Sequence, residues 1–278
     1  MSQNGGPVLE IRQVGKTYGA GAKATRAIEN VSFTVADREF VCVVGPSGCG
    51  KTTLLKCVGG LLRPSSGEVL LRGKRVTAPP EEMGFVFQEY GRSLMPWLTV
   101  RKNVLLPLRH KSLGRRERRA LVEEALEAVG LTRFIDHYPW QLSGGMQQRV
   151  AIARALAYQP SILLMDEPFA SVDAQTRGDL EDLVLRVREE FAVTIVFVTH
   201  DIDESVYLSD RVVVLTHAPT EVKEIIGVDL PFPRDQIRTK ELPEFTHLRG
   251  RVYRLIKREQ GDETEADEPV LEAVREGG

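Results

Sequence analysis

A glycine-rich segment with one lysine and two threonines has the residue types that bind a polyphosphate. It follows an apolar run at residues 40–44 and consists of Gly45, Pro46, Ser47, Gly48, Cys49, Gly50, Lys51, Thr52 and Thr53. Glycines let the main chain turn with its N–H groups inward, and the helix that the pattern places next adds the positive end of its dipole. We expect Lys51 to reach the β- and γ-phosphates and the Thr52 hydroxyl to coordinate Mg²⁺. An ordinary glycine-rich turn is the alternative, but the strand and helix signals on both sides favour ATP or GTP binding.

Two adjacent carboxylates end a second apolar run. Residues 162–165 are all apolar, and Asp166 and Glu167 follow them. In a nucleotide hydrolase, a buried strand of this kind ends beside the phosphate-binding loop. Asp166 is then expected to hold the magnesium ion, and Glu167, on the opposite side of the chain, to polarise the water that attacks the γ-phosphate. An exposed acidic turn is the alternative.

A third segment offers a second place for an anion. Ser143 is a residue type that caps helices, and Gly144 and Gly145 leave main-chain N–H groups bare at the start of a helix predicted to run to Ala157. A plain helix cap explains Ser143 but not its position shortly before residues 162–167. The chain therefore has two predicted phosphate sites.

Residues 142–149 resemble the signature sequence of ATP-binding cassette (ABC) proteins, and the resemblance extends through most of the chain. Met146 stands where many members of that family have glutamine, a departure that leaves Ser143 and both glycines intact. The resemblance implies a head-to-tail dimer of two copies of the chain. In such a dimer each phosphate loop faces the signature of the other subunit, and two ATP molecules lie between the subunits.

The resemblance also implies roles for four residues outside these segments. Tyr18 matches the aromatic residue that stacks on adenine, and Gln88 matches the glutamine that contacts magnesium and the attacking water. His200 matches the switch histidine that hydrogen-bonds the γ-phosphate. Asp173 matches a residue that communicates across the dimer, and it is equally a candidate N-cap of the helix that follows.

An unusually apolar segment follows Gln88, and it contains Met95, Pro96, Trp97 and Leu98. In ABC importers, which the chain resembles, this region helps to form the groove that receives a helix of the membrane subunit. Such a groove accounts for exposed aromatic and thioether surface. The alternative is that Trp97 packs inside a helical subdomain.

The function that the resemblance implies is that of the ATP-hydrolysing subunit of an importer. This subunit powers uptake of a small solute through separate membrane subunits and works indirectly with a solute-binding protein. The segments that look most like the nitrate, sulfonate and taurine import group are residues 94–100, 173–177 and 228–235.

Two other classes of protein remain as alternatives. An ABC ATPase acting on DNA or ribosomes is one, but the sequence shows neither heptads nor a repeat. A P-loop kinase or a GTPase is another, and neither would be expected to carry residues 143–145.

Composition narrows the possible partners. The chain has 278 residues and a net charge of −2, which argues against a general nucleic-acid surface. It has no apolar stretch of membrane-spanning length, so we expect a cytoplasmic protein, and the resemblance to importer subunits implies a peripheral place at the cytoplasmic face of the cell membrane. The three cysteines, Cys42, Cys49 and Cys57, show neither zinc-site spacing nor the even number of a disulfide framework.

Strands and helices must hold these residues in place. Alternation of apolar and polar residues predicts half-buried strands at residues 8–14 and 31–35. Continuous apolar runs predict buried parallel strands at residues 40–44, 162–165, 194–198 and 212–215. Helical spacing predicts helices at residues 115–129, 174–191 and 245–256.

We therefore predict an α/β fold with a P-loop (RecA-like) core sheet, an N-terminal antiparallel β subdomain and an inserted α-helical subdomain at about residues 89–160. The ABC ATP-binding domain is predicted to cover residues 1–220. Residues 221–278 are predicted to form a C-terminal extension, with an acidic, disordered tail from about residue 259.

Overall fold

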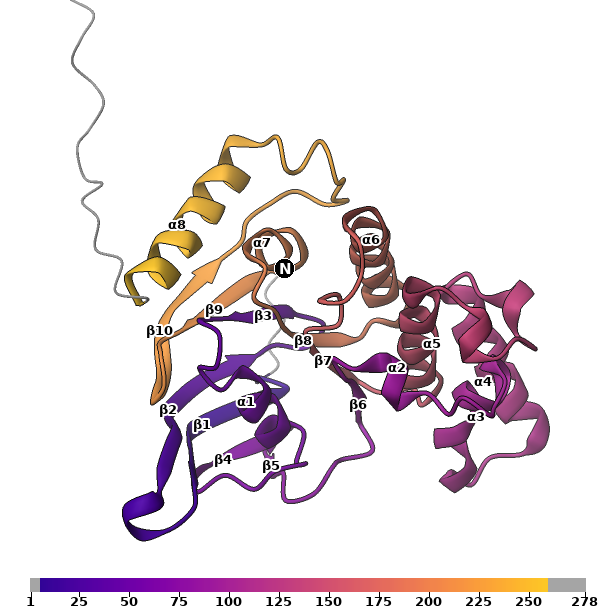
Figure 1. The fold of residues 1–278 in the computed structure, drawn as a ribbon, viewed down its shortest axis with the longest axis horizontal. Helices are drawn as coiled ribbons and strands as arrows, with labels where there is room; N and C mark the ends of the chain where they lie inside the picture. The colour runs from indigo at the N-terminus through magenta and orange to yellow at the C-terminus, as the bar shows by residue number, and fades with distance from the viewer. Residues whose placement is uncertain (1–5, 260–278) are drawn as a thin grey trace, which may run out of the picture.

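The computed structural model describes residues 6–259, and its central element is a sheet of ten strands (Figure 1). Their order across the sheet is β5-β4-β1-β2-β10-β9-β3-β8-β7-β6. Their bounds are β1 Leu9–Tyr18, β2 Thr25–Val35, β3 Phe40–Val44, β4 Ser66–Leu71, β5 Lys74–Arg75, β6 Met83–Val86, β7 Ile162–Asp166, β8 Thr194–Val198, β9 Arg211–Leu215 and β10 Thr220–Gly227. One sheet thus runs through both the predicted core and the predicted β subdomain.

One half of the sheet is parallel. The strands β6, β7, β8, β3 and β9 pair in parallel in that order. Every residue of β3, β7 and β8 is buried, as expected where both faces of a parallel sheet are covered. Parallel strands end at the same edge of a sheet, so the loops after β3, β7 and β8 come together there.

The other half is antiparallel, which confirms the predicted fold class. β1 pairs with β2 and β4, and β4 pairs with β5, all antiparallel. β10 runs antiparallel to β9 and parallel to β2. It therefore joins the two halves into one sheet.

The α-helices are α1 Lys51–Val58, α2 Tyr90–Ser93, α3 Val100–Leu105, α4 Arg115–Ala128, α5 Gly144–Ala157, α6 Ala174–Phe191, α7 Ile202–Leu208 and α8 Pro243–Glu259. Short 3₁₀ helices are η1 Gly21–Lys23, η2 Leu106–His110, η3 Thr132–Phe134 and η4 Pro139–Gln141. Figure 1 shows α2, α3, α4 and α5 gathered in a lobe beyond the β6 end of the sheet. This lobe is the inserted helical subdomain.

Buried apolar side chains form two clusters that β3 separates. Phe40, Cys42 and Val44 belong to one cluster, and Val41 and Val43 belong to the other. Because successive side chains of a strand point to opposite faces, the two clusters lie on opposite faces of the sheet. The first cluster includes the buried side chains of α3 to α8, and the second includes those of α1.

The structure differs from expectation mainly near the C-terminus. Residue 220, the predicted end of the ATP-binding domain, is the first residue of β10, and the sheet continues past it. This strand was not predicted, because polarity does not follow its alternating exposure: Glu224 is half-buried and Ile225 is exposed. Residue 259 is the last residue of α8, and the rest of the predicted acidic tail lies outside the described residues.

Candidate functional site

The phosphate loop (residues 45–53) connects β3 to α1, as the pattern requires. Gly48 and Gly50 have φ values of +76° and +105°, which lie in the left-handed region that favours glycine. At Gly45, an added Cβ would lie 3.0 Å from Cys49 Sγ and from Leu215 Cβ. The loop is therefore compact, and it leads directly into the N-terminus of α1, where main-chain N–H groups are available to an anion.

Lys51 lies across the phosphate loop. Its Nζ donates to the carbonyl oxygens of Gly45 at 2.9 Å and Pro46 at 3.1 Å, and the residue is only 5% exposed. A buried ammonium bonded to neutral carbonyls can exchange these partners for phosphate oxygens, which are the stronger acceptors. The loop and its lysine fit a polyphosphate.

Thr52 and Asp166 form the second part of the site. The Thr52 hydroxyl donates to Asp166 Oδ1 at 2.9 Å, so two of the three predicted magnesium-binding residues are in contact. Burial raises the pKa of Asp166, and the hydrogen bond from Thr52 opposes that rise. Hydroxyl and carboxylate oxygens are ligands that suit Mg²⁺, which usually also binds substrate phosphates and water. Within residues 6–259 no group of three or more His, Cys, Asp or Glu residues is placed to hold a metal ion.

Glu167 lies at the centre of the third part of the site. Its Oε2 accepts a hydrogen bond from Gln88 Nε2 at 3.2 Å and lies 3.0 Å from His200 Nδ1. The three side chains come from the segments that follow β6, β7 and β8. Glu167 has a φ of +42°, and its N–H donates to Val198 O at 2.9 Å. The structure therefore brings together all three predicted catalytic residues.

Tyr18 adjoins the phosphate loop from β1. Its hydroxyl lies 3.2 Å from Thr53 Oγ1, and the residue is 43% exposed. Tyr18 is the last residue of β1. An exposed ring at the end of a strand beside α1 is available for stacking on a base.

The signature (residues 142–149) lies in the helical lobe, away from α1 (Figure 1). Ser143 is the N-cap of α5, and its Oγ accepts from Met146 N at 3.3 Å. Ser143 and Gly144 are exposed. Within one chain, the structure does not bring this segment to the phosphate loop, so a shared site needs a second copy.

Asp173 caps α6 as predicted. Its Oδ1 accepts from Thr176 N at 3.0 Å, and its Oδ2 accepts from Thr176 Oγ1 at 2.7 Å. Thr176 also contacts the signature, because a Cβ added at Gly145 would lie 2.3 Å from Thr176 Cγ2. The Asp173 loop and the signature are thus in contact through a residue that sequence reasoning did not single out.

We expect Gly145→Ala to destabilise the chain by about 1–3 kcal/mol, because the new methyl group overlaps the Thr176 side chain. Thermal denaturation should show a lowering of Tm by several degrees, at about 2–4 °C per kcal/mol. The matched control is Gly227→Ala, where nothing lies within 4 Å of the added Cβ. Equal Tm values for the two variants would contradict the close contact between α5 and α6.

A polar network missed by sequence reasoning supports the His200 loop. The Thr199 hydroxyl donates to Glu204 Oε2 at 2.6 Å, and Arg177 Nη1 lies 3.0 Å from Asp201 Oδ2. Burial raises the pKa of Glu204 to about 7. The residues on both sides of His200 are thereby tied to α6 and α7. The run of acids after His200 was the only signal in the sequence.

Fold and site together define a P-loop nucleotide hydrolase. The comparison with protein families then narrows this class, because residues 28–170 match the family model described as ABC transporter. The chain belongs to the ABC transporter family of ATP-binding proteins. It binds ATP, and its activity is ATP hydrolysis.

Relatives in this family match over most of the chain. An uncharacterized ABC transporter ATP-binding protein of Methanocaldococcus jannaschii is 47% identical, over 90% of this chain and 92% of that protein. The aliphatic sulfonates import ATP-binding protein SsuB of Bacillus thuringiensis is 43% identical, over 86% of this chain and 96% of its own length. The nitrate import ATP-binding protein NrtC of Synechococcus elongatus is 45% identical over 84% of this chain, which spans 36% of NrtC.

Solved structures share the fold. A dimeric ATP-binding cassette in a post-hydrolysis state, bound to ADP and Pi, matches with a TM-score of 0.69 and 37% identity, over 79% of this chain and 98% of that one. CbiO1 of Clostridium perfringens matches with a TM-score of 0.72 and 28% identity, over 80% of this chain and 88% of that one. These findings confirm the predicted family, fold class and ATPase activity. Within residues 6–259, no helix combines the length and apolar character that a membrane span requires.

Proposed function

We propose that this chain is the ATPase subunit of an importer for nitrate, a sulfonate or taurine, and that it acts from the cytoplasmic face of the membrane through separate permease subunits. The observation that carries the proposal is that Gln88 and His200 both contact Glu167 beside the phosphate loop. The signature of the same chain lies at the start of α5, in the helical lobe. The relatives named as sulfonate and nitrate import proteins support the choice of solutes.

The proposed chemistry assigns one task to each part of the site. The phosphate loop and Lys51 bind the phosphates, while the Thr52 hydroxyl and the Asp166 carboxylate hold Mg²⁺. The ion, when bound, offsets phosphate charge. Glu167 accepts a proton from the attacking water, and its contacts with Gln88 and His200 fix the orientation of its carboxylate. Tyr18 stacks on adenine.

The proposed working unit contains a second copy of the chain. Ser143, Gly144 and Gly145 of one copy complete the phosphate site of the other, with Asp173 close to the dimer contact. ATP then favours the closed dimer because it binds that state more tightly than the open one. Closing moves the attached permease subunits, and hydrolysis reopens the dimer.

The proposed docking segment lies on the helical lobe. Trp97 is 71% exposed, so its ring does not pack inside the subdomain, and Pro96 beside it is also exposed. Met95 and Leu98 are half-buried, and Met95 is held by Asn103 through hydrogen bonds to its N–H and C=O. The backbone of the segment is thus fixed while the indole is presented outward. Such an anchor fits a pocket or groove on a permease subunit.

We expect Trp97→Ala to weaken binding to the permease by about tenfold or more, because an exposed tryptophan anchor typically contributes 2 kcal/mol or more to an interface. ATP turnover by the isolated chain should stay within about twofold of the parent, since Trp97 is exposed on the helical lobe and is none of the residues assigned to ATP binding or hydrolysis. The binding is measured with the permease in detergent micelles. Tyr253→Ala on α8 serves as the control, because that ring is also exposed, at 53%. Equal losses of binding in both variants would contradict docking at this segment.

The importer assignment is tested by affinity purification of the chain from detergent-solubilised native membranes. Mass spectrometry should identify a multi-span membrane protein and a solute-binding protein among the recovered partners. Nitrate, taurine and alkyl sulfonates are then tested as ligands of the solute-binding protein by thermal shift. Recovery of ribosomal or DNA-repair proteins instead would overturn the assignment and leave the ATPase activity standing.

A further inference from the structure

The segment between β10 and α8 crosses the two helices that follow the Asp173 and His200 loops. We name residues 228–242 the strap. Figure 1 shows it running from the end of β10 past α7 to one end of α6, where the chain turns back toward α8. Val228 and Leu230 anchor its first part in the core. Asp173 and Asp201 are the N-caps of α6 and α7, so any contact that fixes these helices also affects the loops before them.

Arg234 of the strap caps the C-terminus of α7. Its Nη2 donates to Ser209 O at 2.8 Å, and its Nη1 donates to the carbonyl oxygens of Val206 and Tyr207. Carbonyl groups in the last turn of a helix have no partner within the helix, and a cation there also interacts favourably with the helix dipole. Burial lowers the pKa of Arg234 to about 10, so the guanidinium stays charged at neutral pH. Arg234 thus fixes the end of α7 opposite His200.

Gln236 attaches the strap to the first half of α6. Its Nε2 lies 3.1 Å from Gly178 O, 2.9 Å from Glu181 Oε2 and 2.9 Å from Asp182 Oδ1. All three partners are acceptors, which places the NH₂ group of the amide on this side. Asp182 also accepts from the hydroxyl of the buried Tyr207 of α7 at 2.7 Å. At Asp182 the strap, α6 and α7 therefore meet.

Glu181 of α6 links the strap to the His200 loop through the charge of Glu204. Glu181 is 3% exposed, and Gln236 and Lys240 of the strap are its polar partners, the latter at 3.5 Å. Burial raises the pKa of Glu181, and these two strap residues oppose the rise. The charge of Glu181 in turn contributes to the raised pKa of Glu204, after burial and Asp201. Glu204 accepts the hydrogen bond from Thr199, the residue before His200.

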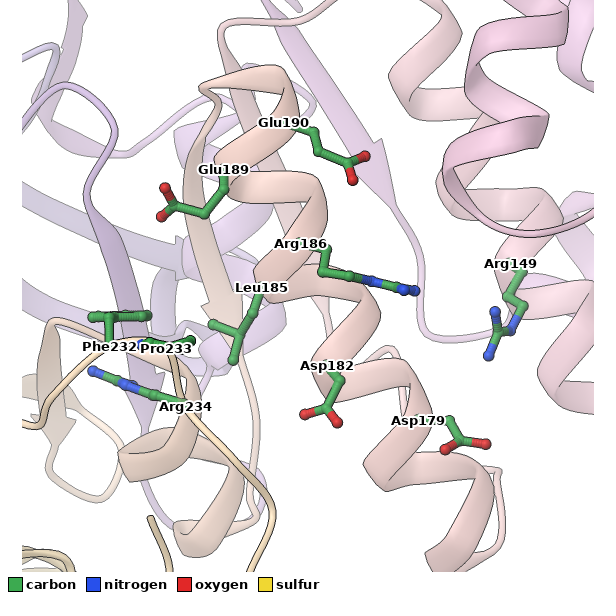
Figure 2. A pocket seen from close by; sticks show the side chains of 10 residues that line it. All are labelled: Arg149, Asp179, Asp182, Leu185, Arg186, Glu189, Glu190, Phe232, Pro233 and Arg234. Carbon is green, nitrogen blue, oxygen red and sulfur yellow. The ribbon is translucent and has the colours of Figure 1, made fainter. Parts of the chain in front are cut away.

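The strap does not follow α6 along its whole length. An open cavity of about 700 Å³ lies along α6 from Asp179 to Glu190, and Figure 2 shows Leu185, Arg186 and Glu189 of the second half of the helix among the side chains that line it. Phe232 and Pro233 of the strap line the same cavity. The hydrogen bonds of Gln236 reach only residues 178–182 among the described residues of α6, and these begin about one helical turn after the Asp173 cap.

We propose that the strap positions the loops that carry Asp173 and His200, with Gln236 and Arg234 as its positioning residues. Their hydrogen bonds are made to α6 and to the C-terminal end of α7. Each acts by fixing α6 or α7, from which the two loops extend. The inference rests on the proposed roles of Asp173 and His200 in ATP hydrolysis.

The test is a charge series at Gln236 in the full chain. Gln236→Glu places a third carboxylate against Glu181 and Asp182, and it should lower kcat by about tenfold with KM changed much less, as for a displaced catalytic group. Gln236→Lys supplies a cation to the same carboxylates and should restore kcat to within about twofold of the parent. Ile237→Ala, at an adjacent side chain that is 68% exposed, should leave kcat unchanged. Gln236→Ala, with an intermediate loss, replaces Gln236→Glu if the latter does not fold.

Hydrogen exchange followed by mass spectrometry separates positioning from a general loss of stability. Gln236→Glu should speed exchange at residues 171–178 and 199–206, while Gln236→Lys and Ile237→Ala should not. Faster exchange confined to the strap, or a fall in kcat without a change in the two loops, would overturn the proposal.

A double variant separates this inference from the proposed function. In a His200→Ala background, Gln236→Glu should lower kcat by a smaller factor than it does in the parent, because the part of its effect that passes through the His200 loop is already lost. If His200→Ala alone turned over ATP at the parental rate, the proposed role of His200 would be wrong. The exchange experiment would still decide whether the strap positions the loop.

Discussion

Glu167→Gln is expected to lower the kcat of ATP hydrolysis by about 10²–10⁴-fold, the usual contribution of a general base. The amide cannot accept a proton from the attacking water at neutral pH. It has the shape of the carboxylate, and its oxygen can still accept the hydrogen bond that Gln88 Nε2 now donates at 3.2 Å. ATP binding should therefore survive, because the phosphate loop and Lys51 are unchanged. Phosphate release gives kcat, and ATP-dependent thermal shift reports binding.

Glu189→Gln on α6 is the matched control, because it makes the same chemical change on a residue that lines the cavity in Figure 2, away from the phosphate loop. Its kcat should equal that of the parent. Turnover by Glu167→Gln at the parental rate would show that another group accepts the proton. Size-exclusion chromatography with ATP adds a second readout, since blocked hydrolysis should accumulate the closed dimer.

Lys51→Ala is expected to weaken ATP binding by about 10- to 100-fold, which corresponds to losing a hydrogen bond to a charged group worth about 1.5–3 kcal/mol. Lys51 is buried and already bridges the loop carbonyls of Gly45 and Pro46. Its ammonium is therefore held where it can transfer to phosphate oxygens without a large movement. Titration calorimetry measures the affinity directly.

The same substitution should also lower the stability of the nucleotide-free chain, because two carbonyl groups lose their donor. For that reason, the Tm gain on adding ATP, and not Tm itself, reports binding. Lys56→Ala is the control, since Lys56 is an exposed lysine on the same helix. An unchanged ATP affinity in Lys51→Ala would show that main-chain N–H groups alone bind the phosphates.

The sequence by itself determined the elements whose signals are local. The helix predicted at residues 174–191 is α6, and the strands predicted at 40–44 and 194–198 are β3 and β8. Asp173 and Ser143 cap their helices as predicted, and Gly130, with a φ of +72°, follows the end of α4. The spacing of apolar residues, the helix caps and the left-handed glycines each depend only on residues that are close in sequence. These signals can therefore be recognised without knowing the fold.

The site was predicted in part from residue chemistry and in part from resemblance. The phosphate loop and the acids at residues 166–167 were predicted from the chemistry of their side chains and their positions after apolar runs. In the structure, Thr52 of the loop contacts Asp166. Gln88 and His200 could be named only through the resemblance, since neither residue stands in a pattern of its own. They meet Glu167 because β6, β7 and β8 are adjacent in the sheet, across gaps of 79 and 33 residues.

The tertiary structure alone decided where the C-terminal part belongs and what surrounds the site. β10 completes the sheet, Gln236 attaches the strap to α6, and Thr176 fills the space that Gly145 leaves. The exposure of Trp97 likewise depended on how the helical lobe folds. Each of these features rests on contacts between residues far apart in the chain. Such contacts leave no periodic trace in the sequence, so only the packing of the whole fold could determine them.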